Sequence, residues 1–399
     1  MNKCAVWTVF ALFILMAVFG INNNVYAVEN TGNDIYVFDK LTEFTQLFPK
    51  REAYTQREKD AANYLKEQFI NMGLTPYFDD YLQSVVDFDG RKSQNVVAVK
   101  EADTSQFVVI GAHYDNVGLS NADGASDNGS GVAVLLSLAN KLKDIELPFS
   151  VVFVAFGAEE VGMEGSYNFV YEIATQAEKC LLYINLDSIA CGDYCYIYGE
   201  DIKTPYVDFF INTYEKSSSK INTIKNVSTS RNISLITFYD KPYYAQYFSS
   251  DSAVFRDAGI PTVAFFSGNL DYAYSYTESA ESVKRVMHTQ NDNLHYIESA
   301  YGDIYKRNML SVQNCVLNTL TNDAFYANIV GARDYMINSL LYSGLYPILA
   351  GAVLVIVGII FCVSKYRKLQ KTAYLTESGV KNFMIFSQPK EDEIFTFKN

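Results

Sequence analysis

The chain has 399 residues, which is enough for one large domain or two smaller ones. Apolar residues make up 49% of it and aromatic residues 15%, so the composition is that of a folded protein and not of a disordered one. The formal net charge is −13. A surface this acidic repels phosphate backbones, so nucleic acid is not expected as a partner.

The first residues have the pattern of an export signal. Lys3 is followed by an apolar run from Ala5 to Phe19, and Val25-Tyr26-Ala27 resembles a signal peptidase site. The alternative is an anchor that is not cleaved, although the run is short for a membrane span. We therefore expect residues 1–27 to be a signal peptide.

A second hydrophobic segment lies near the other end of the chain. Residues 344–364 contain no charge and are long enough to cross roughly 30 Å of hydrocarbon. They are followed by the basic residues Lys365, Arg367, Lys368 and Lys371. Positive residues stay on the cytoplasmic side of a membrane, so we expect one span, a cytoplasmic C-terminus and an extracellular main domain.

These segments divide the chain into five expected parts. They are a signal peptide, a folded domain, a juxtamembrane connector, a transmembrane helix and a cytoplasmic tail, at residues 1–27, 28–322, 323–343, 344–364 and 365–399. An exported domain permits disulfides, and Cys191 and Cys195 are close enough in sequence to close a small loop. Free thiols are the alternative, because sequence does not determine pairing.

The start of the folded domain predicts one helix and several extended segments. Thr55 to Glu58 form a capping-box pattern, and apolar residues then recur at helical spacing up to Gly73. This predicts a surface helix of about 16 residues. Extended segments are expected at 76–86, 95–100 and 107–113, and the next helix at 132–142.

Strands and helices alternate through the rest of the domain. Strands are expected at 150–156, 181–186, 194–198 and 260–266. Helices are expected at 165–173, 207–216, 251–258 and 292–320, with a loop region at 217–249. The alternation predicts an α/β fold with a mixed, mostly parallel central sheet and helices on both faces. Ligands of such sheets bind at the carboxyl ends of the strands.

Residues of metal-binding type occur at these strand ends. Those at the ends of three expected strands are His113, Asp115, Glu159, Glu160 and Asp187; Asp127 precedes a helix, and His288 and Asp292 follow the last strand. Each has an ordinary explanation when taken alone: a surface His-Asp pair, solvent-exposed glutamates, or an aspartate capping a helix. Their joint occurrence at one edge of a sheet favours a metal site.

In combination, the motifs resemble those of the M28 family of co-catalytic zinc aminopeptidases. The motifs are His113-x-Asp115, Asp127-Asn-x-Ser-Gly131, Glu159-Glu160, Asp187 and His288-Thr-x-x-Asp292. The resemblance extends from about residue 51 to about residue 320. It implies a zinc exopeptidase-like fold and a metallo-aminopeptidase that acts on peptides with a free N-terminus.

The resemblance also implies the ligands of two zinc ions. Asp127 would bridge the ions, since a shared carboxylate reduces their repulsion. His113 and Asp187 would complete the shell of one ion. Glu160 and His288 would complete that of the other. Zinc suits these nitrogen and oxygen ligands, but manganese or cobalt could also occupy them.

Three further residues acquire roles from the same resemblance. Glu159 would be the general base, taking a proton from a metal-bridging water and passing it to the leaving amine. Asp115 and Asp292 would orient the two ligand histidines by accepting from their other ring nitrogens. The acidic surroundings would attract the ammonium group of a peptide N-terminus.

Two positions depart from the family pattern. Met287 stands where members often have Tyr, and Ser252 stands where they often have His. Another group would then stabilise the oxyanion, or the zinc would do so alone. The candidate donors are Tyr243, Tyr244, Tyr247 and Arg256, and for each of them ordinary packing is the alternative.

Two other functions are compatible with this scaffold. One is a glutaminyl cyclase-like enzyme, which works with a single zinc ion. The other is a catalytically silent ectodomain used for adhesion or as a receptor, which predicts missing ligands. The complete set of ligand residues disfavours both.

Overall fold

The computed structural model describes residues 35–192, 194–198, 210, 225–226, 250–268, 285–327, 329–330, 359, 363 and 365. Outside them lie the expected segment 1–27, nearly all of 207–216, 217–249, 344–364 and 365–399, and Tyr243, Tyr244 and Tyr247. No helix in the described part of the chain has the length and apolar character that a membrane span requires. The chain divides into two units, Met1–Arg333 and Asp334–Asn399, and the elements below belong to the first.

One mixed sheet forms the centre of this unit. Its strands among the described residues are β1 (Thr75–Pro76), β2 (Leu82–Val86), β3 (Lys92–Lys100), β4 (Phe107–His113), β5 (Ser150–Phe156), β6 (Cys180–Leu186), β7 (Tyr194–Tyr198), β8 (Lys225–Asn226) and β9 (Thr262–Gly268). Their order is β1-β3-β5-β4-β6-β9-β7-β8, and β2 also pairs with β3.

The sheet is parallel at its centre and at its β7–β8 edge, and it is antiparallel elsewhere. The pairs β5–β4, β4–β6 and β6–β9 are parallel. Antiparallel pairs join β3 to β5, β2 to β3 and β7 to β9. The mixed sheet is as expected, but its parallel pairs are limited to the three central ones and β7–β8. β2 and β3 are joined by a short turn, and a connection of that length permits only antiparallel pairing.

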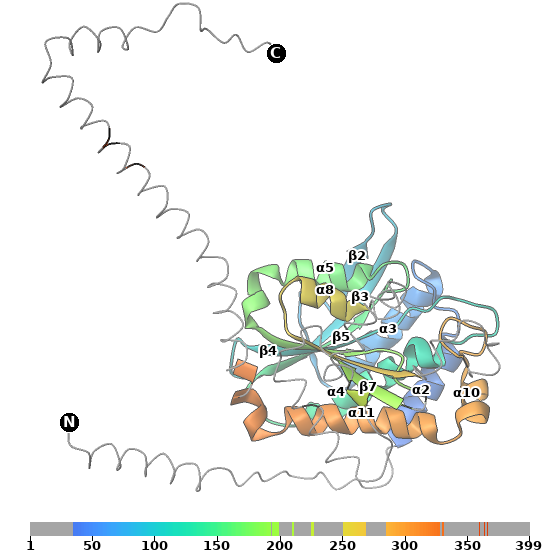
Figure 1. Ribbon diagram of the computed structural model, residues 1–399. Helices are drawn as coiled ribbons and strands as arrows, with labels where there is room; N and C mark the ends of the chain where they lie inside the picture. The colour runs from blue at the N-terminus through green and yellow to red at the C-terminus, as the bar shows by residue number, and fades with distance from the viewer. Residues whose placement is uncertain are drawn as a thin grey trace, which may run out of the picture. The chain divides into compact units, whose positions relative to one another are not determined.

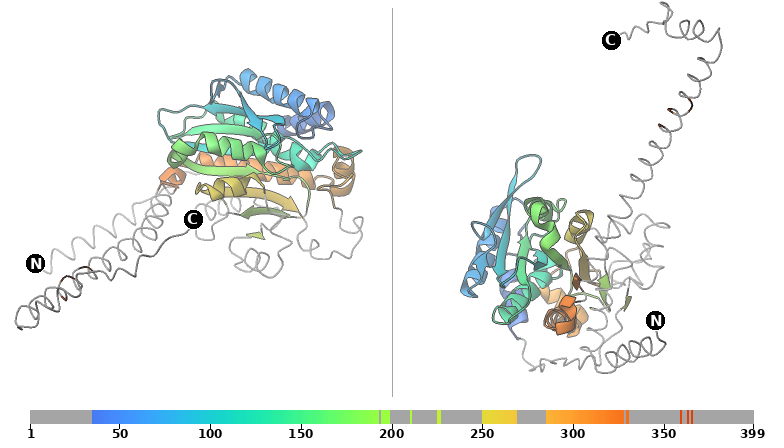
Figure 2. Two further views of the ribbon diagram at one scale, coloured as in Figure 1. Left: turned by 90° about the horizontal axis from the view of Figure 1, so that it is seen from above. Right: turned by 90° about the vertical axis from the view of Figure 1, so that its left-hand side faces the viewer.

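Helices cover both faces of the sheet. They are α2 (Ile35–Leu47), α3 (Gln56–Asn71), α4 (Gly131–Leu142), α5 (Glu164–Glu172), α8 (Asp251–Asp257), α10 (Leu294–Tyr301) and α11 (Ile304–Leu320). α4 and α11 lie on one face, and α5 and α8 lie on the other (Figure 1; Figure 2, right). A short segment with π-helical hydrogen bonding, Ala125–Ser130, precedes α4, and Asp127 and Asn128 within it have non-helical backbone angles.

Alternate residues of the central strands enter two separate cores. Val108 and Ile110 of β4 belong to the core under α4, whereas Val109 packs in the core that contains Phe169 of α5 and Phe255 of α8. All five side chains are fully buried. Successive side chains of a strand point to opposite faces, so a strand covered on both faces is apolar throughout. This accounts for the continuous apolar run that ends at the site.

Most expected elements are present, with shifted or divided ends. The predicted 16-residue helix is α3, and Thr55 caps it by accepting from the Glu58 N–H. The extended segment expected at 76–86 is two strands, β1 and β2. The single helix expected at 292–320 is two helices, because Gly302 adopts a φ of 52° between α10 and α11. A positive φ of this kind ends a helix.

Both ends of the domain contain structure that the sequence patterns did not predict. α2 precedes the first expected helix and buries Val37, Leu41 and Phe44. Phe325 and Ile329 fall in the expected connector 323–343, yet both are buried in the core. Of the two alternatives for the cysteines, the structure has free thiols, and Cys180, Cys191, Cys195 and Cys315 are all buried.

We predict that Gly111→Ala destabilises the protein. A Cβ at this position of β4 would lie 2.5 Å from the ring of Phe156 and 2.8 Å from that of Tyr183. Overpacking of this kind costs about 1–3 kcal/mol, which urea denaturation would measure as a lower free energy of unfolding. An unchanged free energy of unfolding would show that the two rings move aside at no cost.

Candidate metal centre

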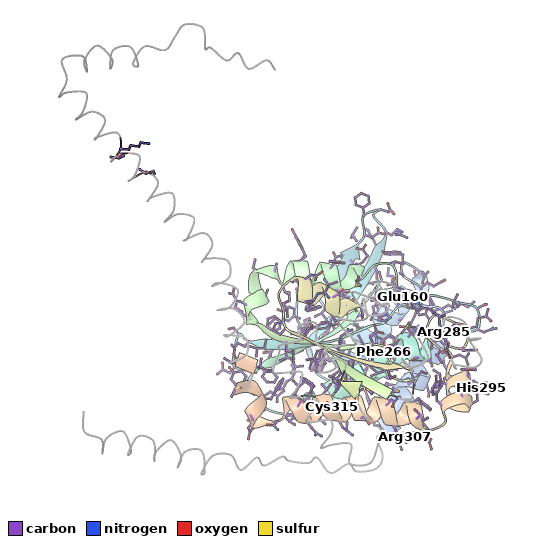
Figure 3. All side chains as sticks on the ribbon, viewed as in Figure 1. Glu160, Phe266, Arg285, His295, Arg307 and Cys315 are labelled. Atoms are coloured by element: carbon purple, nitrogen blue, oxygen red, sulfur yellow. The ribbon has the colours of Figure 1, made fainter. Side chains whose placement is uncertain are left out.

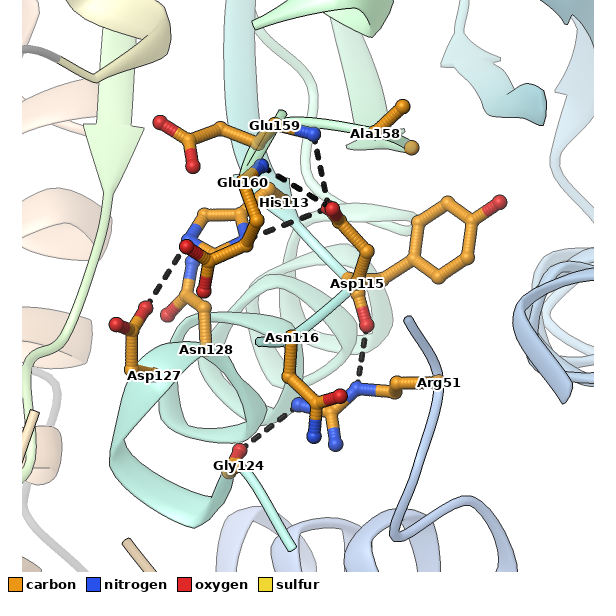
Figure 4. Close-up of polar contacts among 12 residues, drawn as sticks. Arg51, His113, Asp115, Asn116, Gly124, Asp127, Asn128, Ala158, Glu159 and Glu160 are labelled. Carbon is orange, nitrogen blue, oxygen red and sulfur yellow. Dashed lines mark hydrogen bonds and ion pairs between the residues drawn. The ribbon is translucent and has the colours of Figure 1, made fainter. Parts of the chain in front are cut away.

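The expected ligand residues come from separate segments and meet at one edge of the sheet. His113 is the last residue of β4, and Asp187 directly follows β6. Glu160 lies in the turn after β5, and Asp127 lies in the π-helix before α4. His288 precedes α10. Because β4, β5 and β6 are parallel, their carboxyl ends bring His113, Glu160 and Asp187 to the same edge. Figure 4 shows His113, Asp127 and Glu160 there.

The ligand atoms form two groups that share Asp127. His113 Nε2 lies 3.2 Å from Asp127 Oδ1 and 3.4 Å from Asp187 Oδ1. His288 Nε2 lies 3.1 Å from Asp127 Oδ2 and 3.1 Å from Glu160 Oε2. Within each group the ligand atoms lie within 4.8 Å of one another. Asp127 thus presents one oxygen to each group.

The two groups fit a metal ion each. Each group supplies one imidazole nitrogen and two carboxylate oxygens, which are ligands that zinc accepts, and three protein ligands leave room for water and substrate. Glu160 Oε1 is buried without a hydrogen-bond partner. Buried polar atoms normally have a partner, so this unpaired oxygen is consistent with an ion ligand.

The turn that carries Glu159 and Glu160 is fixed by side chains from elsewhere. The four consecutive N–H groups of residues 157–160 donate, in order, to Asn95, Glu58, Asp115 and Asp115. The two carboxylate oxygens of Asp115 lie 3.0 Å from the Glu159 nitrogen and 3.1 Å from the Glu160 nitrogen. Asp115 therefore sets the direction in which both glutamates leave the backbone.

The two aspartates expected to orient histidines mainly accept hydrogen bonds from backbone N–H groups. Asp115 Oδ1 lies 3.6 Å from His113 Nδ1, which is longer than a hydrogen bond, so its main contacts are those to the glutamate turn. Asp292 was expected to orient His288, but its carboxylate accepts from the Ser126 and Asp127 N–H groups at 2.7 and 3.1 Å. No contact between Asp292 and His288 occurs among the described residues. Asp292 instead holds the Asp127 loop.

The surrounding carboxylates raise the proton affinity of both histidines. Burial alone would lower the pKa of His113, but nearby carboxylates, Glu159 foremost, raise it well above its usual value. Hydrogen bonds to Asp127 and then Glu160 raise the pKa of His288 to about 11. Burial would raise the pKa of Asp127, but its contacts with the two histidines lower it. The carboxylates around the two histidines therefore favour the protonated form of each ring.

The adjacent glutamates differ in their surroundings. Burial raises the pKa of Glu159 well above its usual value; His113 opposes this shift and Asp251 adds to it. Burial, followed by the charge of Asp127, raises the pKa of Glu160 to about 7. Glu160 contacts His288, whereas the carboxylate of Glu159 makes no hydrogen bond or ion pair with the described residues. The two neighbouring glutamates are therefore held differently.

Three buried charged residues beside the site were not among the candidates from sequence. They are Arg51, Glu58 and Asp251. Neither oxygen of Asp251 has a hydrogen-bond partner, and burial raises the pKa of this carboxyl group to about 7. Single charged residues give no periodic signal, so the sequence offered little sign of their burial. The capping-box position of Glu58 was the one available indication.

Other polar candidates lie away from the ligand groups or are otherwise engaged. Arg256, a candidate oxyanion donor, is partly exposed and pairs with Asp257 on its own helix at 2.8 Å. Ser252 is fully buried. His295, the third histidine, is exposed on α10 and lies apart from Glu160 (Figure 3). None of these provides an evident substitute for the family's tyrosine.

Two curated proteins are similar to part of the chain. "Alkaline phosphatase isozyme conversion protein" of Escherichia coli is 33% identical over 181 residues, which cover 40% of this chain and 52% of that protein. "Aminopeptidase YwaD" of Bacillus subtilis is 28% identical over 214 residues, which cover 53% of this chain and 42% of that protein. The chain thus matches about half of the length of these relatives.

Solved structures share the fold at low sequence identity. A structure described as a zinc aminopeptidase from Bacillus subtilis is 16% identical, with a TM-score of 0.53, and the match covers 71% of this chain and 93% of that one. A glutaminyl cyclase from Porphyromonas gingivalis is 18% identical, with a TM-score of 0.51, over 71% of this chain and 95% of that one. At these identities the likeness establishes the fold alone.

The model of peptidase family M28 matches residues 95–313, which is more than half of the chain. The matched region contains every residue of the two ligand groups and Glu159. The motif order, the sheet and this match agree, and the chain belongs to peptidase family M28.

Proposed function

We propose that the protein is an aminopeptidase that uses two zinc ions to remove N-terminal residues from peptides. The observation that carries this proposal is the position of Asp127, whose two oxygens face the Nε2 atoms of His113 and His288 at 3.2 and 3.1 Å. One carboxylate between two ligand groups is the arrangement that a pair of metal ions requires. The relative named as an aminopeptidase adds support.

Glu159 is the residue to which we assign proton transfer. Zinc, when bound, supplies Lewis acidity that polarises the scissile carbonyl and makes a water more acidic. Glu159 takes a proton from the water that attacks this carbonyl and delivers it to the amine released when the C–N bond breaks. Burial raises the pKa of Glu159, which brings its basicity closer to what this transfer needs.

The acidity of the site favours a substrate with a free amino terminus. Glu159 lies at the same edge of the sheet as the ligand groups, and the chain as a whole has a formal charge of −13. An ammonium group is attracted to such an edge, whereas a substrate carboxylate is repelled. This supports cleavage at the N-terminus in preference to the C-terminus.

The second candidate is a glutaminyl cyclase, favoured by the shared fold of the Porphyromonas gingivalis enzyme. A single ion would leave one of the two ligand groups without a purpose, and both groups are complete here. Metal analysis separates the two: two equivalents of zinc support the peptidase and one supports the cyclase. Hydrolysis of amino-acid p-nitroanilides, abolished by a chelator, would exclude a silent ectodomain.

We further propose that the catalytic domain is extracellular and anchored by residues 344–364, after removal of residues 1–27. The hydrophobic character of these segments and the basic residues after 364 support this orientation. A tag at the C-terminus should be reached by antibody only after cells are permeabilised, while a tag beside residue 35 should be reached in intact cells. Labelling of the C-terminal tag in intact cells would reverse the proposed orientation.

We predict that Glu159→Gln retains zinc but loses turnover, by about 10²- to 10⁴-fold in kcat, because the base is removed and the ligands remain. Asp127→Ala should lose both ions, because it removes the shared ligand. Zinc content and p-nitroanilide hydrolysis measure the two effects. Glu172→Gln, an exposed change on α5, is the matched control. Full activity of the Glu159 variant would refute its assignment as the base.

Zinc affinity should rise with pH. In the metal-free protein the pKa of each histidine lies above its usual value, that of His288 at about 11, so both carry a proton near neutral pH. A ligating histidine must be neutral, so binding releases these protons and becomes tighter as pH increases. Calorimetry in buffers of different ionisation enthalpy counts the released protons. Equal affinity at about pH 6.5 and about pH 8.5 would contradict the prediction.

A further inference from the structure

Residues 48–58, which connect α2 to α3 and include the first turn of α3, contact the loop before Asp127 and the turn that carries Glu159 and Glu160. This segment lies before residues 95–313, which the family model matches. Two of its charged side chains, Arg51 and Glu58, are buried, with 0% and 1% of their surface exposed. Charged residues are rarely buried to this extent unless they are paired. Their partners therefore indicate what the segment does.

Arg51 holds the loop that leads to Asp127. Its guanidinium donates to the backbone oxygens of Tyr114, Asp123 and Gly124, the last two at 2.6 and 2.8 Å. Figure 4 shows the contact with Gly124. Tyr114 directly follows His113, so the contacts join the end of β4 to the loop before the π-helix. The planar guanidinium has five donors in fixed directions, which suits several acceptors at once.

The charge of Arg51 also interacts with the carboxylates around the site. Burial alone would lower the pKa of the guanidinium, but Asp292, Asp123, Asp115 and Asp127 each oppose this. A guanidinium remains charged in proteins. Arg51 is therefore a buried cation that offsets part of the repulsion among these carboxylates, whether or not metal is bound.

Glu58 holds the other loop. Its Oε1 accepts from the Ala158 N–H at 3.1 Å and from the hydroxyl of Ser93, and its Oε2 accepts from the Tyr54 N–H at 2.6 Å. Ala158 immediately precedes Glu159, and its φ of 55° is unusual for a residue other than glycine. The Glu58 carboxylate thus fixes a turn whose backbone would otherwise be unfavourable.

We propose that Arg51 and Glu58 are positioning residues for the two ligand groups. Arg51 acts through the Asp127 loop, which both groups share. Glu58 acts through the turn that carries Glu159 and Glu160, and therefore on one group and the base. This inference rests on the proposed zinc peptidase function and adds to it that a segment outside the family match sets the metal affinity.

The experiment compares Arg51→Lys and Glu58→Gln with wild type, all as the full-length chain. The controls Arg57→Lys and Glu67→Gln change exposed residues of α3. Zinc affinity is measured by titration against a competing chelator, the folding of the metal-free proteins by circular dichroism, and kcat and KM by p-nitroanilide hydrolysis. Ser93→Ala, which removes one donor to Glu58, is a milder second variant.

We expect Arg51→Lys to weaken binding of both zinc equivalents by about 10- to 100-fold, because lysine keeps the charge but cannot reach three carbonyls. Glu58→Gln should weaken one equivalent by a similar factor and lower kcat, with KM changed by no more than about twofold. Ser93→Ala should have a smaller effect in the same direction. The controls should match wild type.

A purely structural role predicts a different result. Arg51→Lys and Glu58→Gln would then unfold at lower temperature, yet the folded fraction would bind both ions as tightly as wild type, and this outcome overturns the inference. If Arg51→Lys does not fold, the test rests on Glu58→Gln and Ser93→Ala. Unchanged zinc binding by both of these variants overturns the inference. A wild-type protein that binds zinc and hydrolyses substrate while the variants behave normally refutes only this inference. If the wild-type protein neither binds zinc nor hydrolyses substrate, the proposed function is refuted as well.

Discussion

The repulsion among buried carboxylates at one edge of the sheet is the constraint on which the rest of the site depends. Asp115, Asp127, Asp292 and Glu160 are all largely buried. In the metal-free protein their charges are met by backbone N–H groups, two protonated histidines and the guanidinium of Arg51. Metal ions would take over the part now played by the protons. These partners hold the carboxylates in place, and outer partners of this kind support metal affinity.

The central parallel strands determine where the ligand residues lie relative to one another. The register of β4 against β5 pairs His113 with Phe156. The turn that begins at Gly157 therefore starts next to His113. The adjoining turn after β6 places Asp187 beside the same histidine. Tight packing two residues before His113 fixes these strands further, because Gly111 leaves space only for the rings of Phe156 and Tyr183. The core and the site therefore share residues of the same strands.

Sequence patterns could predict the strands, and the family resemblance named the residues of the two groups, but neither could show how those residues are held. Buried strands appear as apolar runs, and the residues after each run are placed by the parallel sheet, so His113 and Asp187 could be assigned to one edge. The hydrogen-bond partners of Asp292 could not be predicted, because a carboxylate in a loop accepts from whichever donors lie nearest. Burial of Arg51 depends on contacts 63 to 73 residues away, which no local pattern encodes. The only sequence sign of the break between α10 and α11 was Gly302 itself, because glycine is unfavourable inside a helix.

The central claim is that two metal ions share Asp127. The most direct measurement is a crystal structure of the zinc-loaded protein with anomalous scattering recorded above and below the zinc absorption edge. The account predicts two peaks about 3.5–4 Å apart, one beside His113 and Asp187 and one beside Glu160 and His288. A single peak, or a pair of peaks that both lie away from Asp127, would contradict it.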